Sequence, residues 1–207
     1  MMLSLRRTCE MFRGLSFPLI VAGLLVARPA QAQQVREFSL NGLGHFLGSS
    51  AAPVLIVEFA DFGCPNCARF NVDVFPRIEA AYINTKIVRW KVIPWSSNYF
   101  PNSREAAEAI ECAAEQGAFW QMHDRMYESR GALSRQDLIA HAGELGLDAG
   151  RVAAELDSSV HAPRVQRDLD SGLASGVTGT PTFFVGGRLH AGSFDAASLI
   201  AALELSA

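Results

Sequence analysis

The chain has 207 residues, of which 49% are apolar and 19% charged, and its formal net charge is −3. This length suits one domain, or one domain with an insertion, and the apolar fraction excludes a disordered chain. The chain has no block of like charge, so nothing points to nucleic acid as a partner. Four cysteines are too few for a small disulfide-stapled protein.

Residues 1–32 have the pattern of a cleaved secretory signal. Residues 1–14 carry three arginines, residues 15–27 are uncharged and mostly apolar, and Ala30 and Ala32 occupy the positions that a signal peptidase recognises. A membrane anchor is the alternative, but about 20 apolar residues are needed to span a bilayer. We therefore expect export to the periplasm or another extracytoplasmic space. Cleavage after Ala32 leaves a net charge of about −6.

The rest of the chain divides by its residue pattern. Residues 33–53 are rich in glycine and serine and are expected to form an N-terminal lead-in. Residues 54–100 contain two apolar runs rich in β-branched residues, one before and one after a predicted helix. Residues 176–207 contain a predicted hairpin and a final helix. Residues 101–175 have helical periodicity throughout, so we expect a helical insertion between two parts of a thioredoxin-like domain. Within it, Ser103 should cap the first helix, and Ser134 should lie at the polar start of a later one.

The order of these elements predicts the fold class. A strand over 54–60, a helix over about 64–83 and a strand over 86–93 form a crossover unit, whose two strands should be parallel. The hairpin over 182–191 should add antiparallel strands. We therefore expect an α/β protein with a mixed central sheet, helices on both faces and an inserted helical subdomain. Pro76 should bend the first helix.

Cys64 and Cys67 are separated by two residues at the start of the first helix. Such a pair can form a redox-active disulfide, form a structural disulfide or bind a metal. Zinc usually needs four ligands, and neither Cys112 nor the five histidines have ligand spacing, so we expect no metal and no cofactor. A structural disulfide over so short a loop constrains little of the unfolded chain. Redox chemistry is the favoured interpretation.

The two cysteines differ in their expected positions. Cys64 falls at the helix N-cap, where free backbone N–H groups and the helix dipole stabilise a thiolate. Pro65 falls at the first helical position, where its missing N–H costs nothing. Cys67 lies one turn further in and should be less exposed. We expect Cys64 to form the mixed disulfide with a substrate and Cys67 to resolve it.

Two residues outside the motif fit this chemistry. Glu58 lies within an apolar strand, where an unpaired carboxylate is costly. It is either a strand-end acid that reaches solvent or a proton acceptor beneath Cys67, with a pKa raised by burial. Pro181 enters a strand, which removes a backbone donor. An ordinary trans turn is the simpler interpretation, whereas a cis bond would present the Thr180 backbone as an open edge to an extended substrate.

The run Glu58-Phe-Ala-Asp-Phe-Gly-Cys64-Pro-Asn-Cys67, followed by a helical stretch and Gly-Thr-Pro181-Thr, resembles the DsbA-like thioredoxin-fold family of extracytoplasmic thiol–disulfide oxidoreductases. The resemblance covers about residues 47–205. It implies that Cys64 is the nucleophile, Cys67 the resolving cysteine and Pro181 the cis-proline beside them. It also implies that Glu58 is the acid beneath the disulfide.

The residues around the pair are expected to contact the substrate. These are Pro65, Asn66 and Thr180, together with Phe62, which could be exposed beside the motif. Asn66 differs from the histidine of the best-known family members and cannot offer the thiolate a positive charge. Cys112 fits a small core residue, with a third redox thiol as the alternative.

The resemblance implies an enzyme that exchanges disulfides with unfolded or extended secreted proteins. We expect a dithiol oxidase renewed by a membrane quinone-linked oxidase. A reductase or isomerase supplied by a membrane electron donor is the alternative. A non-catalytic periplasmic chaperone, a copper-handling module and a kappa-type glutathione transferase share the fold, but the intact cysteine pair argues against them. The absence of a long N-terminal helical stalk favours a monomer.

Overall fold

The computed structural model describes residues 40–206. The expected signal over 1–32 and the first part of the lead-in lie outside the described residues. The elements in chain order are β1 (His45–Leu47), β2 (Val54–Ala60), α1 (Pro65–Arg69), α2 (Phe75–Ile78), β3 (Val88–Pro94), α3 (Ser103–Glu115), α4 (Phe119–Glu128), α5 (Arg135–Glu144), α6 (Ala149–Ser158), α7 (Ala162–Ala174), β4 (Thr182–Val185), β5 (Arg188–Leu189) and α8 (Ala196–Glu204). No helix within residues 40–206 combines the length and the apolar character that crossing a membrane requires.

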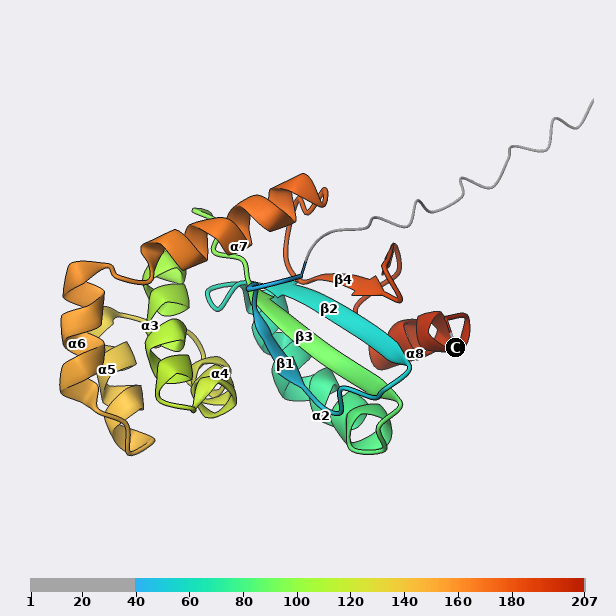
Figure 1. Ribbon diagram of the computed structural model, residues 1–207, viewed down its shortest axis with the longest axis horizontal. Coiled ribbons are helices and arrows are strands. Elements are labelled where there is room, and N and C mark those ends of the chain that lie inside the picture. Colours follow the sequence, from blue (N-terminus) through green and yellow to red (C-terminus); the bar gives the residue numbers. More distant parts are fainter. Residues whose placement is uncertain (1–39, 207) are drawn as a thin grey trace, which may run out of the picture. The chain divides into compact units, whose positions relative to one another are not determined.

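The strands of the described region form one mixed sheet in the order β1-β3-β2-β4-β5 (Figure 1). β2 and β3 are parallel, with Glu58 opposite Val92, and β4 runs antiparallel to β2, with Glu58 opposite Phe183. β1 and β5 add antiparallel edges. The parallel pair, the hairpin and the mixed sheet expected from the sequence are confirmed.

The two faces of the sheet are covered by different helices. Along β2, side chains alternate between the faces. Ile56 packs in a cluster that includes Ile78 of α2 and Leu199 of α8. Phe59 packs in the opposite cluster, which Leu169 of α7 covers. The predicted placement of helices on both faces is therefore confirmed, and Glu58 shares its face with the helix that carries the cysteines.

The helical run after β2 is irregular. Wide π-type turns over Phe70–Val74 and Glu79–Ile83 follow α1 and α2, and together these segments continue to Ile83. Pro76 has no N–H and cannot complete a regular α-helical hydrogen bond, so the helix departs from α-geometry beside it. The interruption falls where Pro76 was expected to bend the helix.

The helical insert comprises α3 to α7, between β3 and β4. Ser134 and Asp137 form a capping box at the start of α5, and Asp148 caps α6. The expectation that Ser103 caps α3 is wrong. Asn102 occupies the cap with a φ of 63°, and Ser103 is the first helical residue because its hydroxyl donates to Asp61 instead.

Helix α7 packs closely against Trp95, the residue that follows β3. A β-carbon at Gly172 would lie 2.3 Å from Nε1 of Trp95, so this position requires glycine. The Trp95 indole also donates a hydrogen bond of 3.1 Å to the carbonyl oxygen of Leu169. These contacts fix the last helix of the insert directly on the segment that follows β3.

Candidate active site

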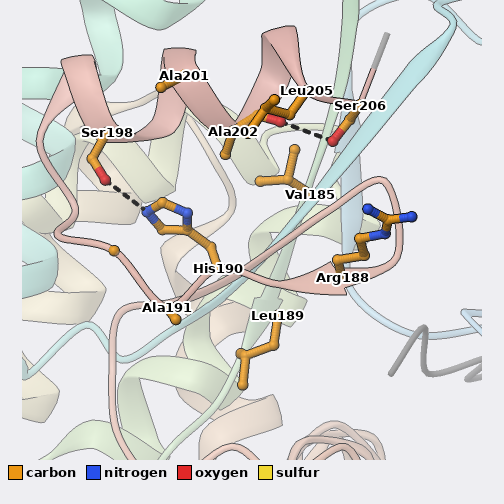
Figure 2. Close-up of a pocket in the computed structure, with 11 residues that line it drawn as sticks. Val185, Arg188, Leu189, His190, Ala191, Ser198, Ala201, Ala202, Leu205 and Ser206 are labelled. Atoms are coloured by element: carbon orange, nitrogen blue, oxygen red, sulfur yellow. Dashed lines mark hydrogen bonds between the residues drawn. The ribbon is translucent and has the colours of Figure 1, made fainter. Parts of the chain in front are cut away.

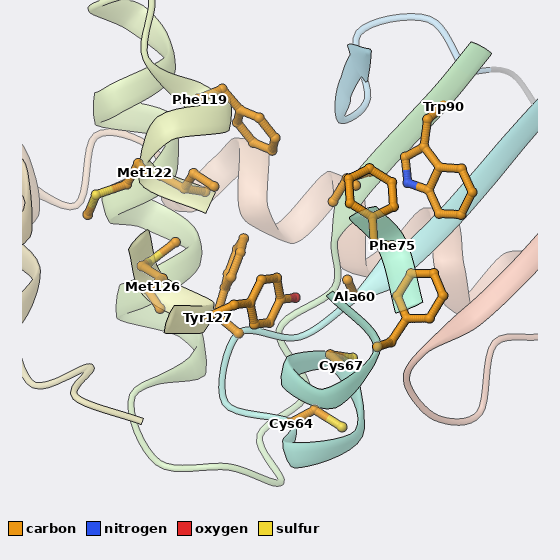
Figure 3. Packing of buried hydrophobic residues seen from close by; sticks show 14 of the residues in the cluster. Ala60, Cys64, Cys67, Phe75, Trp90, Phe119, Met122, Met126 and Tyr127 are labelled. Atoms are coloured by element: carbon orange, nitrogen blue, oxygen red, sulfur yellow. The ribbon is translucent and has the colours of Figure 1, made fainter. Parts of the chain in front are cut away.

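The cysteine pair sits where β2 ends and α1 begins. Cys64 is the N-cap of α1 and Pro65 is its first residue, as predicted. Cys67 lies one turn further in, and both cysteines are free thiols (Figure 3). Cys64 is 3% exposed and Cys67 is fully buried, whereas Pro65 and Asn66 between them are exposed. The motif therefore lies at the surface, but its sulfur atoms are covered.

The loop before β4 provides the cover over Cys64. The peptide bond between Thr180 and Pro181 is cis, as the resemblance implies. The sulfur of Cys64 lies 3.3 Å from the carbonyl oxygen of Thr180. Thr180 and Pro181 are themselves half-buried. The Thr180 carbonyl group is therefore a direct neighbour of the Cys64 sulfur.

The two thiols differ strongly in acidity. The pKa of Cys64 is lowered to about 6, mainly by a hydrogen bond from the Cys67 thiol. Burial acts in the opposite direction and raises this pKa. The Thr180 side chain and nearby backbone N–H groups lower it further. Burial is the main cause that raises the pKa of Cys67 well above its ordinary value, with Cys64 adding to it. At neutral pH the reduced pair therefore holds a thiolate on Cys64 and a proton on Cys67.

Glu58 is fully buried and is linked to Cys67 through Asn71. Nε1 of Trp90 donates to one carboxylate oxygen at 3.1 Å, and Nδ2 of Asn71 lies 3.4 Å from the other. The same Asn71 nitrogen donates to the Cys67 carbonyl oxygen at 3.0 Å. Burial raises the pKa of Glu58 to about 8 against these hydrogen bonds. The alternative of an acid that reaches solvent is therefore wrong, and the carboxyl group is mostly protonated at neutral pH.

Asp61 is a buried acid to which the sequence analysis assigned no role. Its carboxylate accepts hydrogen bonds from the Gly63 N–H at 2.8 Å, from the Ser97 N–H and hydroxyl at 3.0 Å, and from the Ser103 hydroxyl. Burial raises the pKa of Asp61, and these hydrogen bonds oppose the shift. Asp61 therefore ties the loop before Cys64 to the start of α3. The local signal was the Asp-x-Gly spacing, which is typical of an Asx-turn.

Phe62 does not have the expected position. It is 4% exposed, and its ring lies 5.1 Å from that of Tyr127 and 5.9 Å from that of His123. The expectation that Phe62 is exposed is wrong, because the ring packs against α4 of the insert. Figure 3 shows Tyr127 reaching from α4 toward the helix that carries Cys67. The Tyr127 hydroxyl is buried and has no hydrogen-bond partner among the described residues.

Two hollows flank the hairpin after Pro181. One of about 210 Å³ is lined by Pro181 itself, with Phe183, Leu189 and Phe194 among its other walls. A second, of about 300 Å³, lies between β5 and α8, where His190 hydrogen-bonds to Ser198 (Figure 2). No residue of the cysteine motif lines either hollow, and only the first of the two includes Pro181 in its wall. The first hollow therefore adjoins the cis-proline loop that covers Cys64.

A family model described as thioredoxin matches residues 40–204. The chain belongs to the DsbA-like thioredoxin family. It is a family of thiol–disulfide oxidoreductases. Oxidised BdbD from Bacillus subtilis is 26% identical, with a TM-score of 0.74 over 81% of this chain and 94% of that one. The DsbA-like fold, with its insert α3–α7, is also that of alpha-DsbA1 from Wolbachia pipientis, which is 19% identical, with a TM-score of 0.69 over 78% of this chain and 89% of that one.

The chain is also similar to one part of some larger proteins. The Na(+)/H(+) antiporter NhaA 3 of Salinispora tropica is 40% identical over 161 residues, which cover 77% of this chain and 24% of the antiporter. The chain spans about a quarter of the length of the curated relatives it matches. The similarity thus concerns a DsbA-like portion of those relatives.

Proposed function

We propose that the protein is an extracytoplasmic dithiol oxidase that introduces disulfides into unfolded or extended secreted proteins through Cys64 and Cys67. The observation that carries this proposal is the contrast in pKa between Cys64, lowered to about 6, and Cys67, raised by burial. A stabilised thiolate favours the reduced form of the pair. A pair that favours its reduced form takes electrons from its substrates.

The first step is attack by a substrate thiolate on the sulfur of Cys64 in the Cys64–Cys67 disulfide. The bond between the two cysteines breaks, a mixed disulfide forms between the substrate and Cys64, and the electron pair leaves on Cys67. Neutral Glu58 supports this step, because it can give its proton to the thiolate of Cys67. Asn71, which contacts both Glu58 and the Cys67 backbone, positions the acid.

The second step releases the oxidised substrate. A second substrate thiolate attacks the substrate sulfur of the mixed disulfide, and Cys64 leaves as a thiolate stabilised at the start of α1. Two electrons have then passed from the substrate dithiol to the cysteine pair. A membrane quinone-linked oxidase would accept these electrons and restore the disulfide.

The loop before β4 supports an extended polypeptide as the substrate. The Thr180 carbonyl oxygen faces Cys64, so a bound peptide can pair with this backbone edge while its cysteine approaches the sulfur. The hollow lined by Pro181 and Phe194 offers a place for a neighbouring side chain. We further propose that the protein acts as a monomer, without nucleic acid, in the compartment to which the expected signal over 1–32 directs it.

One feature favours a second candidate, a reductase or isomerase supplied by a membrane electron donor. Asn66 is neutral, and its side-chain oxygen lies 3.4 Å from Nη2 of Arg69. A neutral residue between the cysteines stabilises the Cys64 thiolate less than a cation would, which makes the pair less oxidising.

The redox equilibrium of the pair against glutathione tests the proposal. A strongly oxidising potential supports the oxidase, and a strongly reducing one supports the reductase. Mixed disulfides should accumulate on Cys64 in a Cys67→Ala variant that receives reduced, unfolded substrates. Full activity of a Cys64→Ala variant in substrate oxidation would overturn the mechanism, because it would show that Cys64 is not the sulfur that reacts.

A further inference from the structure

Three side chains of different chemistry meet within the helical insert. Cys112 lies on α3, Glu155 lies on α6, and His161 is the residue that precedes α7. One sulfur, one oxygen and one nitrogen of these residues all lie within 4.8 Å of one another. Spacing along the chain does not reveal this cluster, because each residue comes from a separate helix or helix end.

We propose that Cys112, Glu155 and His161 bind a zinc ion. Zinc is bound by thiolate, imidazole and carboxylate groups, and sites with three protein ligands leave the fourth position to water or another ligand. In tetrahedral geometry, ligand bonds of about 2.0–2.3 Å place the ligand atoms roughly 3.3–3.8 Å apart. The three atoms lie within 4.8 Å of one another, so side-chain rotations that bring each separation into this range complete the site.

The Glu155 carboxylate is oriented for this role. One of its oxygens accepts a hydrogen bond from Nε of Arg151, and the other lies 2.8 Å from Nε2 of His161. The Cys112 thiol also hydrogen-bonds to Glu155. Arg151 therefore holds one oxygen and leaves the other facing His161. Hydrogen-bond partners of this kind fix the geometry of metal ligands.

The charges of the three groups balance those of a divalent ion. A zinc ion that binds the Cys112 sulfur displaces the thiol proton to solvent, and the resulting thiolate and the Glu155 carboxylate together neutralise the two positive charges. Neutral His161 adds none. This balance matters because Cys112 is fully buried and an uncompensated charge there would be costly.

The ligand set also discriminates among ions. Magnesium and calcium prefer oxygen ligands throughout, and monovalent copper prefers thiolates and thioethers, so one sulfur, one nitrogen and one oxygen fit zinc best. His161 is 7% exposed and Glu155 is half-buried, so the edge of the cluster reaches the surface. An ion can therefore enter without unfolding of the insert, and once bound it would join α3, α6 and α7.

The test uses the whole protein with the active-site thiols removed as Cys64→Ser/Cys67→Ser, so that the redox pair cannot bind the metal. We expect one equivalent of cobalt to produce a thiolate-to-cobalt charge-transfer band, and zinc to abolish it by displacement. Cys112→Ser in the same background should lose the band. Arg151→Gln should weaken zinc binding by about 10–100-fold, as expected for an outer hydrogen-bond partner.

His190→Ala serves as the matched histidine control and should bind cobalt as the parent does, whereas His161→Ala should not. Thermal unfolding without metal shows whether each variant is folded, and zinc should raise the Tm of the parent but not that of Cys112→Ser. The proposal is overturned if the parent binds no cobalt, or if folded Cys112→Ser gives an unchanged band. Because the active-site thiols are absent, neither result bears on the proposed oxidase.

Discussion

The indole nitrogen of Trp90 lies 3.1 Å from a carboxylate oxygen of Glu58, which places a neutral, hydrogen-bonded acid beneath the cysteine pair. Glu58→Gln keeps the shape and removes the proton donor. We expect it to slow formation of the reduced pair by about 10²-fold, the scale of general acid–base catalysis. Stopped-flow measurement of Trp fluorescence during substrate oxidation checks this rate.

The pH dependence of this effect has a definite sign. Glu58 is protonated below about pH 8, so the ratio of wild-type to Glu58→Gln rates in the oxidising direction should fall as the pH rises through 8. In the reducing direction, where the base form is required, the ratio should rise instead. Asp73→Asn, an exposed carboxylate on the same helical run, provides the control. A ratio that does not change with pH removes the assigned role of Glu58.

Cys64 should be alkylated at a lower pH than either other described cysteine. Its pKa of about 6 predicts that the rate of iodoacetamide labelling reaches half its maximum near pH 6. Cys67 and Cys112 should remain unlabelled there, because burial raises the pKa of both thiols. Cys67→Ala should move the Cys64 midpoint upward, since the Cys67 thiol is the main cause of the shift. Mass spectrometry of labelled peptides measures all three sites.

Reduction should stabilise the fold increasingly as the pH rises from 6 toward 8. The pKa of Cys64 is about 6 in the folded protein, whereas a cysteine without these interactions has a pKa of 9.0. Between pH 6 and 8 the Cys64 thiol is therefore protonated in the unfolded chain and mostly ionised in the folded one. Stability linked to Cys64 is therefore gained as the pH rises and lost as it falls through 6. Urea unfolding of the reduced and oxidised forms at several pH values measures the difference. An opposite slope would contradict the stabilised thiolate.

Asp61→Ala should destabilise the protein by at least about 3 kcal/mol, because hydrogen bonds to a carboxylate are strong and its donors would be left buried without an acceptor. Ser97 and Ser103 lose their shared partner in this variant. Urea denaturation measures the change. Asp73→Ala is the exposed control and should alter the free energy of unfolding by less than about 0.5 kcal/mol.

Phe62→Ala should act on stability. Loss of a buried phenylalanine costs about 3–5 kcal/mol, and the cavity opens between the active-site loop and Tyr127. Val72→Ala, at a side chain that is 48% exposed, is the control for loss of apolar surface. A normal Tm combined with a raised KM for substrate would instead restore Phe62 to the substrate-contacting role expected from the sequence.

The sequence predicted the elements that depend on local pattern. The apolar run of β2, the helix that Cys64 caps and the polar helix start at Ser134 follow from the local pattern, and all three are confirmed. The assignment of Cys64 and Cys67 to one redox site also followed from their spacing. The structure adds the partners that separate their acidities, such as Thr180.

The errors arose where distant residues decide the outcome. Ser103 is a good capping residue in isolation, but Asp61, which is remote in sequence, takes its hydroxyl. Phe62 was expected at the surface because it lies beside the cysteine motif, yet Tyr127 of the insert packs against it. A buried Glu58 carboxyl group with a raised pKa was one of the two interpretations of the sequence, but no local pattern indicates that Asn71 is its partner. Contacts between separate helices and loops are not encoded in any short segment.

The pairing of Glu58 with Phe183 has a consequence for biosynthesis. These two residues flank the entire insert in the chain, so the sheet closes only when the last strands have been made. Cys64 and Cys67 leave the ribosome long before Thr180 does, and Cys112 is the next sulfur to follow. A newly made chain therefore carries the two thiols without the Thr180 cover until the last strands are in place.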